Sequence, residues 1–360
     1  MTRASPKNEF WRGKRVLVTG HTGFKGGWLT LWLSRMGAEV TGLSLPSTTT
    51  PCLFEAARIG THCLSYEIDI RDAQAVETLV RTQRPEILFH LAAQPLVLAS
   101  YDDPLETFST NVMGTASILN ALRFADHARV VVAITTDKVY ANKEWPFPYR
   151  EDDQLGGYDP YSASKAACEL IISSYRNAFL AKNGIALASA RAGNVIGGGD
   201  WSENRLVPDA IRAWQSDTVL EIRRPSATRP WQHVLEPISG YLVLAESLWS
   251  EPNLAGAYNF GPHTHEAATV RFVIDSALRS WNKLGNREPR VHFGDGAEGL
   301  HEAGWLAVEI AKARDLLGYM PRFSLETSIL RTINWYISYL NGEDAFDLCE
   351  NDFEAFESFV

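Results

Sequence analysis

The stretch KRVLVTGHTGFKG, residues 14–26, joins a short apolar run to a glycine-rich loop. The uniformly apolar run predicts a buried strand. Apolar residues at helical spacing over 28–36, followed by Gly37, predict a helix directly after the loop. Glycines at the spacing G-x-x-G-x-x-G permit a tight turn, close approach of the backbone to a pyrophosphate, and tight packing of strand against helix. The stretch therefore predicts the cofactor loop of a dinucleotide-binding domain.

Strand and helix candidates alternate along the rest of the first half. The apolar runs lie at 39–44, 63–69, 86–91, 129–135 and 185–190, and the helical patterns lie at 73–82, 104–124 and 161–182. The runs are apolar throughout, which is typical of parallel strands covered on both faces. Right-handed crossovers then predict an α/β fold with a doubly wound, Rossmann-type sheet. We expect this domain to span 1–193 with a return segment at 231–262, and a smaller mixed substrate-binding domain to occupy most of 194–360.

Composition narrows the class of protein. The 360 residues are 45% apolar and 21% charged, as in ordinary globular proteins, and the net charge of −9 disfavours nucleic acid or an anionic membrane as a partner. The four cysteines are scattered without a CxxC pair, so we expect reduced thiols and neither a metal site nor disulfides. No apolar segment near the N-terminus resembles a signal peptide, and no run is long enough to span a membrane. We therefore expect a cytoplasmic protein.

The predicted cofactor site combines the loop with the ends of neighbouring strands. Small or apolar side chains would leave the most room for a dinucleotide, whereas His21 and Lys25 are bulky or charged. We therefore expect this loop to hold its cofactor less tightly than a loop with smaller side chains. Lys25 either pairs with the pyrophosphate or points into solvent. Ser44, after the second strand, is neither the acid typical of NAD enzymes nor the arginine typical of NADP enzymes, so this position does not decide between them. The predicted cofactor contacts are Gly20, His21, Thr22, Gly23, Phe24, Lys25, Gly26, Ser44, Asp69, Ile70, Leu91, Ala92, Ala93, Tyr161 and Lys165.

Acid–base groups follow the apolar run at 129–135. Thr136-Asp137-Lys138 comes at its end, and Tyr161 and Lys165 stand one helical turn apart further along the chain. A cation beside a phenol favours phenolate, so we expect the pKa of Tyr161 to fall and the phenol to accept a proton from a sugar hydroxyl. The additional carboxyl and amine exceed what alcohol oxidation needs. They indicate redox chemistry coupled to an elimination.

These pieces together resemble a known family. The motifs are TGHTGFKG (19–26), DIRD (69–72), HLAAQ (90–94), NVMG (111–114), TTDKVY (135–140), YSASK (161–165), RAGNVIGGGDW (191–201), RPWQHV (229–234) and YNFG (258–261). In this order, over roughly 14–340, the chain resembles the extended short-chain dehydrogenase/reductases, and among them the nucleotide-sugar 4,6-dehydratases. The resemblance implies NAD as cofactor, a nucleotide sugar as substrate with CDP-glucose favoured, and a homodimer or dimer of dimers built on helices 104–124 and 161–182. It also implies a step toward the CDP-linked 3,6-dideoxyhexoses of surface polysaccharide.

The resemblance also implies roles for individual residues. Tyr161, aided by Lys165 and Thr136, takes the proton of the C4 hydroxyl, and Asp137 protonates the departing C6 hydroxyl. Better-known members of the family carry Glu where this chain has Lys138, so Lys138 either removes the C5 proton as a neutral amine or stays charged and stabilises the enolate. We expect Asn111 to prop the active site rather than to touch substrate. The implied substrate contacts are Gln94, Asn194, Arg205 and Arg229.

Two other functions remain open at this level. A nucleotide-sugar 4-epimerase of the same fold needs Thr136, Tyr161 and Lys165 but has no use for Asp137-Lys138. A non-catalytic dinucleotide-binding protein has no reason to keep these groups together with an arginine clamp. His301 and Glu302 are candidates near the base or the phosphates, and the acidic, Phe-containing tail at 343–357 predicts a partly packed, solvated end.

Overall fold

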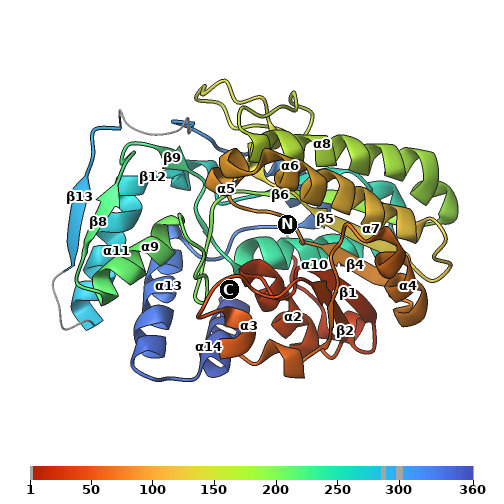
Figure 1. The fold of residues 1–360 in the computed structure, drawn as a ribbon, viewed down its shortest axis with the longest axis horizontal. Coiled ribbons are helices and arrows are strands. Elements are labelled where there is room, and N and C mark those ends of the chain that lie inside the picture. Colours follow the sequence, from red (N-terminus) through yellow and green to blue (C-terminus); the bar gives the residue numbers. More distant parts are fainter. Residues whose placement is uncertain (1–2, 285–288, 297–302, 360) are drawn as a thin grey trace.

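A seven-stranded parallel sheet organises the computed structural model, which describes residues 3–284, 289–296 and 303–359 (Figure 1). Every neighbouring pair in this sheet runs parallel, so the predicted doubly wound fold is confirmed. In spatial order the strands are β11 (Ala257–Phe260), β6 (Ala186–Ala192), β5 (Val130–Ile134), β4 (Ile87–His90), β1 (Arg15–Thr19), β2 (Glu39–Ser44) and β3 (Leu64–Glu67). The order reverses between β1 and β4, which places a crevice at the carboxyl ends of these strands.

Two helical layers cover the sheet. Alternate residues of a strand point into opposite layers. In β1, for example, Leu17 packs on one face of the sheet, and Val16 and Val18 pack on the other. Because both faces are buried, the strands are apolar throughout. One layer contains α2 (Phe24–Arg35) and α10 (Leu235–Ser250); the other contains α4 (Ala73–Gln83), α7 (Gly114–Leu122) and α8 (Pro160–Tyr175). Thus α10 and β11, far along the chain, return to the sheet formed by the first half.

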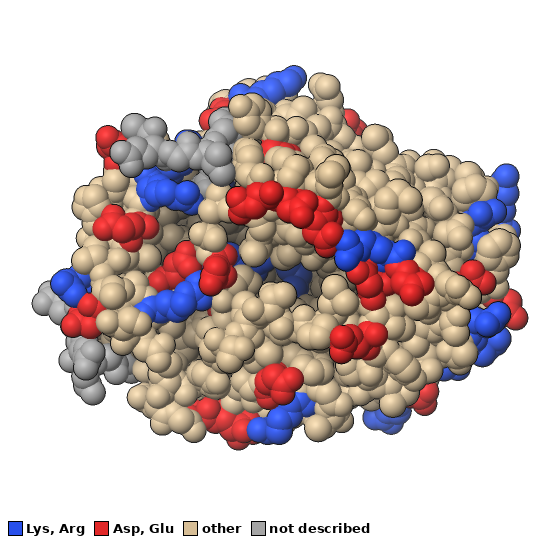
Figure 2. Space-filling model, in the orientation of Figure 1, with Lys and Arg blue, Asp and Glu red and all other residues tan. Residues whose placement is uncertain are grey.

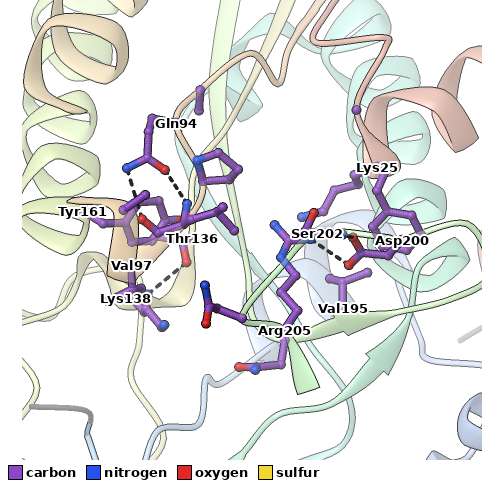
Figure 3. Close-up of a pocket in the computed structure, with 18 of the residues that line it drawn as sticks. Lys25, Gln94, Val97, Thr136, Lys138, Tyr161, Val195, Asp200, Ser202 and Arg205 are labelled. Carbon is purple, nitrogen blue, oxygen red and sulfur yellow. Dashed lines mark hydrogen bonds and ion pairs between the residues drawn. The ribbon is translucent and has the colours of Figure 1, made fainter. Parts of the chain in front are cut away.

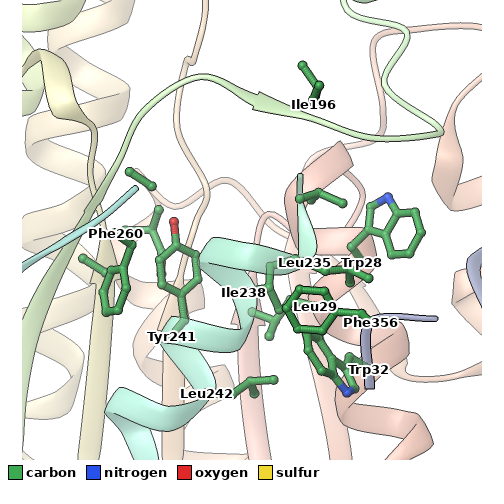
Figure 4. Packing of buried hydrophobic residues seen from close by; sticks show 14 of the residues in the cluster. Trp28, Leu29, Trp32, Ile196, Leu235, Ile238, Tyr241, Leu242, Phe260 and Phe356 are labelled. Atoms are coloured by element: carbon green, nitrogen blue, oxygen red, sulfur yellow. The ribbon is translucent and has the colours of Figure 1, made fainter. Parts of the chain in front are cut away.

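The core beside α2 is rich in aromatic rings. Figure 4 shows Leu235, Ile238 and Leu242 of α10 next to Trp28 and Trp32 of α2. All five side chains are fully or almost fully buried. Burying one large apolar side chain contributes roughly 1.5–3 kcal/mol, so this packing holds α10 firmly on the same face of the sheet as α2.

Two long helices are less regular than predicted. In place of one helix over 104–124, α6 (Pro104–Phe108) runs through a π-helical turn, Ser109–Met113, into α7. Likewise α8 ends in a π turn, Arg176–Leu180, and a 3₁₀ turn, Ala181–Asn183. An inserted π turn rotates the side chains that follow and is frequent at functional sites. The first of these turns carries Asn111.

The second half contributes short elements around the crevice. Its small two-stranded ladders pair β7 (Val195–Ile196) with β10 (Gln232–His233), β8 (Val219–Ile222) with β13 (Arg290–Phe293), and β9 (Thr228–Arg229) with β12 (Ala268–Thr269). The remaining helices are α1 (Asn8–Trp11), α3 (Leu53–Ala56), α5 (Val97–Asp102), α9 (Leu206–Gln215), α11 (Val270–Leu284), α12 (Ala311–Leu317), α13 (Leu325–Leu340) and α14 (Ala345–Ser358). None of the helices within the described ranges is long and apolar enough to cross a membrane.

The acidic tail forms a docked helix. Helix α14 buries Phe353 and Phe356 against the rings of Trp28 and Trp32. Its N-cap, Asp344, accepts two hydrogen bonds from the guanidinium of Arg58, at 2.6 and 3.0 Å. The prediction of a partly packed, solvated end understates this packing, because the Phe residues recur at helical spacing and lie on the buried face.

Candidate active site

A deep cavity opens at the carboxyl edge of the sheet. Its volume is about 1470 Å³, which exceeds the roughly 300–1,000 Å³ typical of a site for one drug-sized ligand. There is therefore room for a dinucleotide and a second ligand. Figure 2 shows this face hollowed near its middle, with basic side chains inside the hollow and acidic ones around its rim.

The glycine loop forms one end of the cavity. A Cβ on Gly26 would lie 2.0 Å from the carbonyl oxygen of Gly20, and a Cβ on Gly20 would lie 2.8 Å from the amide nitrogen of Ala92. Gly20 also has a φ of +78°, which disfavours any side chain. Gly23 is the N-cap of α2 and provides no side-chain cap, so the first amide groups of the helix stay available to an anion. Positions 20 and 26 therefore accept only glycine, and the tight turn that they allow leaves the start of α2 open to a pyrophosphate.

His21 does not crowd the cofactor, contrary to the prediction. Its ring is fully buried and lies over Gly42 of β2, where any Cβ would come within 2.3 Å of it. Nε2 lies 2.7 Å from Oγ of Ser65, and the residue is not part of the cavity wall. Burial lowers the pKa of His21 to about 4, so the ring is neutral at neutral pH. The side chain of His21 therefore has a packing role.

The other predicted cofactor residues line the cavity. Oγ of Ser44 lies 2.8 Å from Oγ1 of Thr22, which fixes the end of β2 to the loop. Asp69 is held by the guanidinium of Arg71, and this hydrogen bond lowers the pKa of the carboxyl. The side chain of Ile70, which lines the cavity, packs against Gly114 of the NVMG motif. A Cβ at position 114 would come within 2.4 Å of this side chain, so the glycine makes room for Ile70. The remaining lining residues of this group are Gly20, Gly23, Phe24, Lys25, Gly26, Leu91, Ala92 and Ala93.

The acid–base residues meet on one wall of the cavity. Figure 3 shows Thr136, Lys138 and Tyr161 side by side, opposite Lys25, Asp200 and Arg205. We call these two sets the catalytic wall, which also includes Asp137 and Lys165, and the charged wall, which also includes Arg229. Oγ1 of Thr136 donates to Oδ1 of Asp137 at 3.0 Å and accepts from the backbone N–H of Lys138 at 3.3 Å.

Burial dominates the proton equilibria on the catalytic wall. It raises the pKa of Tyr161 to about 12, and Asp137 adds to the effect, whereas Thr136 and Arg205 oppose it. The predicted fall in the pKa of Tyr161 is therefore wrong for this structure, because desolvation of the phenolate outweighs nearby positive charge. Burial likewise raises the pKa of the Asp137 carboxyl and lowers that of the Lys165 ammonium. Each of these three shifts favours the neutral form of the group.

Asn111 supports the active-site loop. Its Oδ1 accepts from the backbone N–H of Gln94 at 2.8 Å, and its Nδ2 donates to the carbonyl of Gln94 and to Oγ of Ser164. The propping role expected of Asn111 matches these contacts. Gln94 uses its own side-chain amide within the structure: Nε2 donates to Thr107 and Leu96, and Oε1 accepts from the N–H of Leu96. Gln94 lines the cavity as predicted, but its side-chain amide is engaged in these hydrogen bonds within its own loop and to Thr107.

Basic side chains on the charged wall are balanced by carboxylates and carbonyls. Arg205 donates to Oδ2 of Asp200 at 2.9 Å, and Arg229 donates to the carbonyl oxygens of Thr228 and Ala303. The side chain of Lys25 points into the cavity and not into open solvent (Figure 3). Burial, together with the charges of Arg205 and Lys165, lowers its pKa to about 7 although Asp137 and Asp200 act the other way.

Several residues of the site were not predicted from the sequence. Asp200 lies inside a quoted motif, yet only the fold brings it to Arg205. Arg223 and Arg224, which lie outside the quoted motifs, also line the cavity; Asn194, an implied substrate contact, lines it as expected. Glu169 stands four residues after Lys165, and that spacing was the available signal for it. His301 and Glu302 lie outside the described residues.

The fold and the site define the class of protein: an extended short-chain dehydrogenase/reductase with a Tyr-x-x-x-Lys pair at a dinucleotide crevice. The profile of the family described as GDP-mannose 4,6 dehydratase matches residues 17–332, and the chain belongs to this family. It is 46% identical over 341 residues to a CDP-glucose 4,6-dehydratase of Salmonella typhimurium, covering 93% of this chain and 94% of that one. A UDP-glucose 4-epimerase of Mycolicibacterium smegmatis is 34% identical, with 89% and 98% covered.

A solved structure shows the same fold. The UDP-glucose 4-epimerase of Thermus thermophilus in complex with NAD superposes with a TM-score of 0.74, at 24% identity and with 89% of this chain and 98% of that one covered. At this identity the similarity concerns the fold.

Proposed function

We propose that this protein converts CDP-glucose to CDP-4-dehydro-6-deoxyglucose with loss of one water. The observation that carries the proposal is the catalytic wall, where Asp137 and Lys138 stand beside Thr136 and Tyr161. An epimerase needs to move hydrogen only at C4, whereas loss of the C6 hydroxyl also needs an acid and a group that acts at C5. The 46% identity to a CDP-glucose 4,6-dehydratase supports both the reaction and the nucleotide.

NAD is the proposed cofactor. Gly20 and Gly26 allow the tight turn before α2, and the uncapped start of α2 favours an anion. Ser44, Asp69 and Ile70 line the part of the cavity beyond the loop, where the adenosine half would extend. When bound, NAD supplies reversible uptake of a hydride by a positively charged ring.

Tyr161 is proposed to remove the proton of the C4 hydroxyl. Its phenol faces the cavity, and Thr136 is the neighbouring hydroxyl able to hydrogen-bond the same substrate oxygen. The role requires a phenolate, so the pKa of about 12 must fall when ligands bind. Arg205 already acts in that direction, and further positive charge beside the phenol would act in the same way.

Asp137 is proposed to protonate the departing C6 hydroxyl. Its carboxyl is almost fully buried, and the raised pKa favours the protonated form that an acid needs. Its Oδ2 has no hydrogen-bond partner within the described part of the chain, while Oδ1 accepts from Thr136. One oxygen is therefore available to substrate.

Lys138 is proposed as the base that removes the C5 proton. The variant Lys138→Met tests this role because it keeps an unbranched chain that matches lysine up to Cε and removes the amine. We expect it to retain C4 oxidation and to lose exchange of the C5 proton with solvent deuterium. Retained exchange would assign Lys138 to stabilisation of the enolate instead.

The charged wall is proposed to hold the diphosphate of the substrate. Arg205 and Arg229 line the cavity with guanidinium groups, which bind phosphate oxygens in pairs, and Asn194 lines the same cavity. The carboxylate of Asp200 fixes Arg205 before a ligand arrives.

A homodimer is proposed on the face formed by α6, its π turn and α8. Four large apolar side chains are exposed there, and a second copy of the same helices would cover them: Leu105, Phe108, Met113 and Leu170. Light scattering after size exclusion should report a dimer or dimer of dimers for the wild type and a monomer for Leu170→Glu.

We also place the enzyme in the cytoplasm, since all four cysteines are free. Its place is proposed to be on the route to CDP-linked dideoxy sugars of surface polysaccharide.

Incubation of CDP-, dTDP-, UDP- and GDP-glucose with the protein and NAD, followed by mass spectrometry, tests the function. We expect loss of one water from CDP-glucose alone. Loss of water from another of the four would retain the reaction and reject the nucleotide. An unchanged mass with appearance of the C4 epimer would favour the epimerase, and no reaction at all would favour a non-catalytic dinucleotide-binding protein.

A further inference from the structure

A buried ion pair lies directly behind the catalytic wall. Glu169 and Arg191 are 4% and 3% exposed, and Oε2 of the carboxylate accepts from Nη2 of the guanidinium at 2.8 Å. Neither residue lines the cavity, so neither touches a ligand. Since isolated charges are costly to bury, a pair in this position calls for an explanation beyond stability.

Glu169 joins the two segments that carry the reactive groups. It stands four residues after Lys165 and eight after Tyr161 on α8, so the three share one helical face. Its Oε1 accepts from Oγ1 of Thr135 at 2.5 Å, and Thr135 immediately precedes Thr136. The carboxylate therefore ties the helix of Tyr161 to the strand end of Thr136.

Arg191 holds the C-terminal end of the segment that carries Thr136, Asp137 and Lys138. Its Nη1 donates to the hydroxyl of Tyr140 at 2.9 Å, and that hydroxyl donates to Oδ1 of Asn259 at 2.6 Å. Tyr140 comes two residues after Lys138. The segment 136–138 is thus anchored by this buried pair at both ends, through Thr135 before it and Tyr140 after it.

The pair also places a negative charge near the Lys165 ammonium. Burial acts to raise the pKa of Glu169, but the hydrogen bond and charge of Arg191, together with hydrogen bonds from Thr135 and Ser189, keep it below the usual value. The charge of Glu169 in turn partly offsets the lowering of the pKa of Lys165. Burial raises the pKa of Cys168 and lowers that of His90 to about 3, so both are neutral at neutral pH. The titratable groups around Lys165 are Tyr161, Cys168 and Glu169 on α8, His90 on β4, Lys25 on α2, and Asp137 and Lys138 in the turn that packs against α8.

We propose that Glu169, fixed by Arg191, is a positioning residue that sets the distance between Tyr161 and the Thr136-Asp137-Lys138 segment and offsets part of the cost of burying the Lys165 ammonium. The inference rests on the proposed function only for its kinetic readout. Its structural half concerns the protein without substrate.

The variant Glu169→Gln keeps the shape of the side chain and removes its charge. We expect kcat to fall by about 10- to 100-fold with KM within about twofold, because misplacement of reacting groups by an ångström costs on the order of 100-fold. Loss of the negative charge should also move the alkaline limb of the pH–rate profile to lower pH by on the order of one unit, since Lys165 then loses its proton more easily. In the protein without substrate, amide hydrogen exchange should accelerate in peptides covering 135–140 and stay unchanged in 15–44.

Two milder variants separate the tether from the charge. Thr135→Val breaks the bond between Glu169 and the strand end but keeps the charge, so it should lower kcat and accelerate exchange at 135–140 without moving the pH limb. Ser189→Ala is the matched control: it removes a neutral hydrogen bond of 2.8 Å to the same carboxylate from β6, and should leave kcat, exchange and pH limb unchanged.

The outcomes are distinct. A Glu169→Gln enzyme with kcat within threefold of wild type, or with an unmoved pH limb, would overturn the proposal. If that variant does not fold, Thr135→Val decides: wild-type kcat and wild-type exchange would overturn it. Failure of the wild type to dehydrate CDP-glucose would reject the proposed function alone, because the exchange experiment still tests the positioning role.

Discussion

The two walls of the cavity treat charge in opposite ways. On the catalytic wall, burial favours the neutral forms of Tyr161, Asp137 and Lys165. On the charged wall, Arg205 is paired with Asp200 and its pKa stays raised despite burial. The difference separates two tasks: groups held near neutrality exchange protons readily, whereas a compensated cation holds an anion in place.

Lys25 belongs to the charged wall, but charges from both walls act on its pKa. Its pKa of about 7 reflects burial together with Arg205 and Lys165, opposed by carboxylates on both sides, Asp137 and Asp200. Substitutions on the catalytic wall should mainly affect turnover, and substitutions on the charged wall should mainly affect substrate affinity. The predictions below test this division, beginning with the largest effect.

Removal of the phenol should be the most damaging change. We expect Tyr161→Phe to lower kcat by about 10³- to 10⁴-fold, toward the upper end of what general acid–base catalysis contributes. Affinity for CDP-glucose should change less than threefold in calorimetry, because the ring is retained. A variant with a tenth of the wild-type kcat would contradict the role of Tyr161 at the C4 hydroxyl.

Asp137→Asn should cost about 100-fold in water loss, since the amide is far too weak an acid to protonate the departing hydroxyl. Exchange of the C5 proton with solvent deuterium should persist, which distinguishes this variant from Lys138→Met. In the wild type, the acid form exists below the raised pKa of Asp137, so water loss should slow as the pH rises through that value. Equal loss of exchange and elimination in Asp137→Asn would contradict a role restricted to the C6 hydroxyl.

Arg205→Met should act on affinity. We expect KM for CDP-glucose to rise by about 10- to 100-fold, as for loss of a charge-assisted hydrogen bond, and kcat to fall by less than about tenfold, since Arg205 also lowers the pKa of Tyr161. Steady-state kinetics resolves the two constants. If kcat fell as far as in Asp137→Asn, the division between the walls would not hold.

Asp200→Asn should have the smallest effect. The guanidinium of Arg205 remains but loses its charged partner, so we expect KM to rise by about two- to fivefold through poorer orientation. The matched comparison is the double variant with Arg205→Met, in which the change at Asp200 should add nothing. Full additivity would show that Asp200 acts independently of Arg205.

The sequence predicted the sheet well because its strands are buried on both faces. Runs such as 129–135 carry that pattern locally, and the glycine loop and the Tyr-x-x-x-Lys pair are also local signals. The direction of His21 was missed because it depends on the empty space above Gly42, on another strand. The pKa of Tyr161 was predicted in the wrong direction because adjacency to Lys165 is visible in the sequence and desolvation is not. The Glu169–Arg191 pair joins α8 to β6, and only the folded chain brings the two together.

The most direct test of the account uses CDP-glucose carrying deuterium at C4, with the wild-type protein and NAD. The account predicts that the product loses one water and that NMR finds the deuterium at C6, since hydrogen leaves C4 and returns to the carbon that lost its hydroxyl. Deuterium retained at C4 in a product of unchanged mass would contradict it, because the catalytic wall would then support epimerisation without elimination.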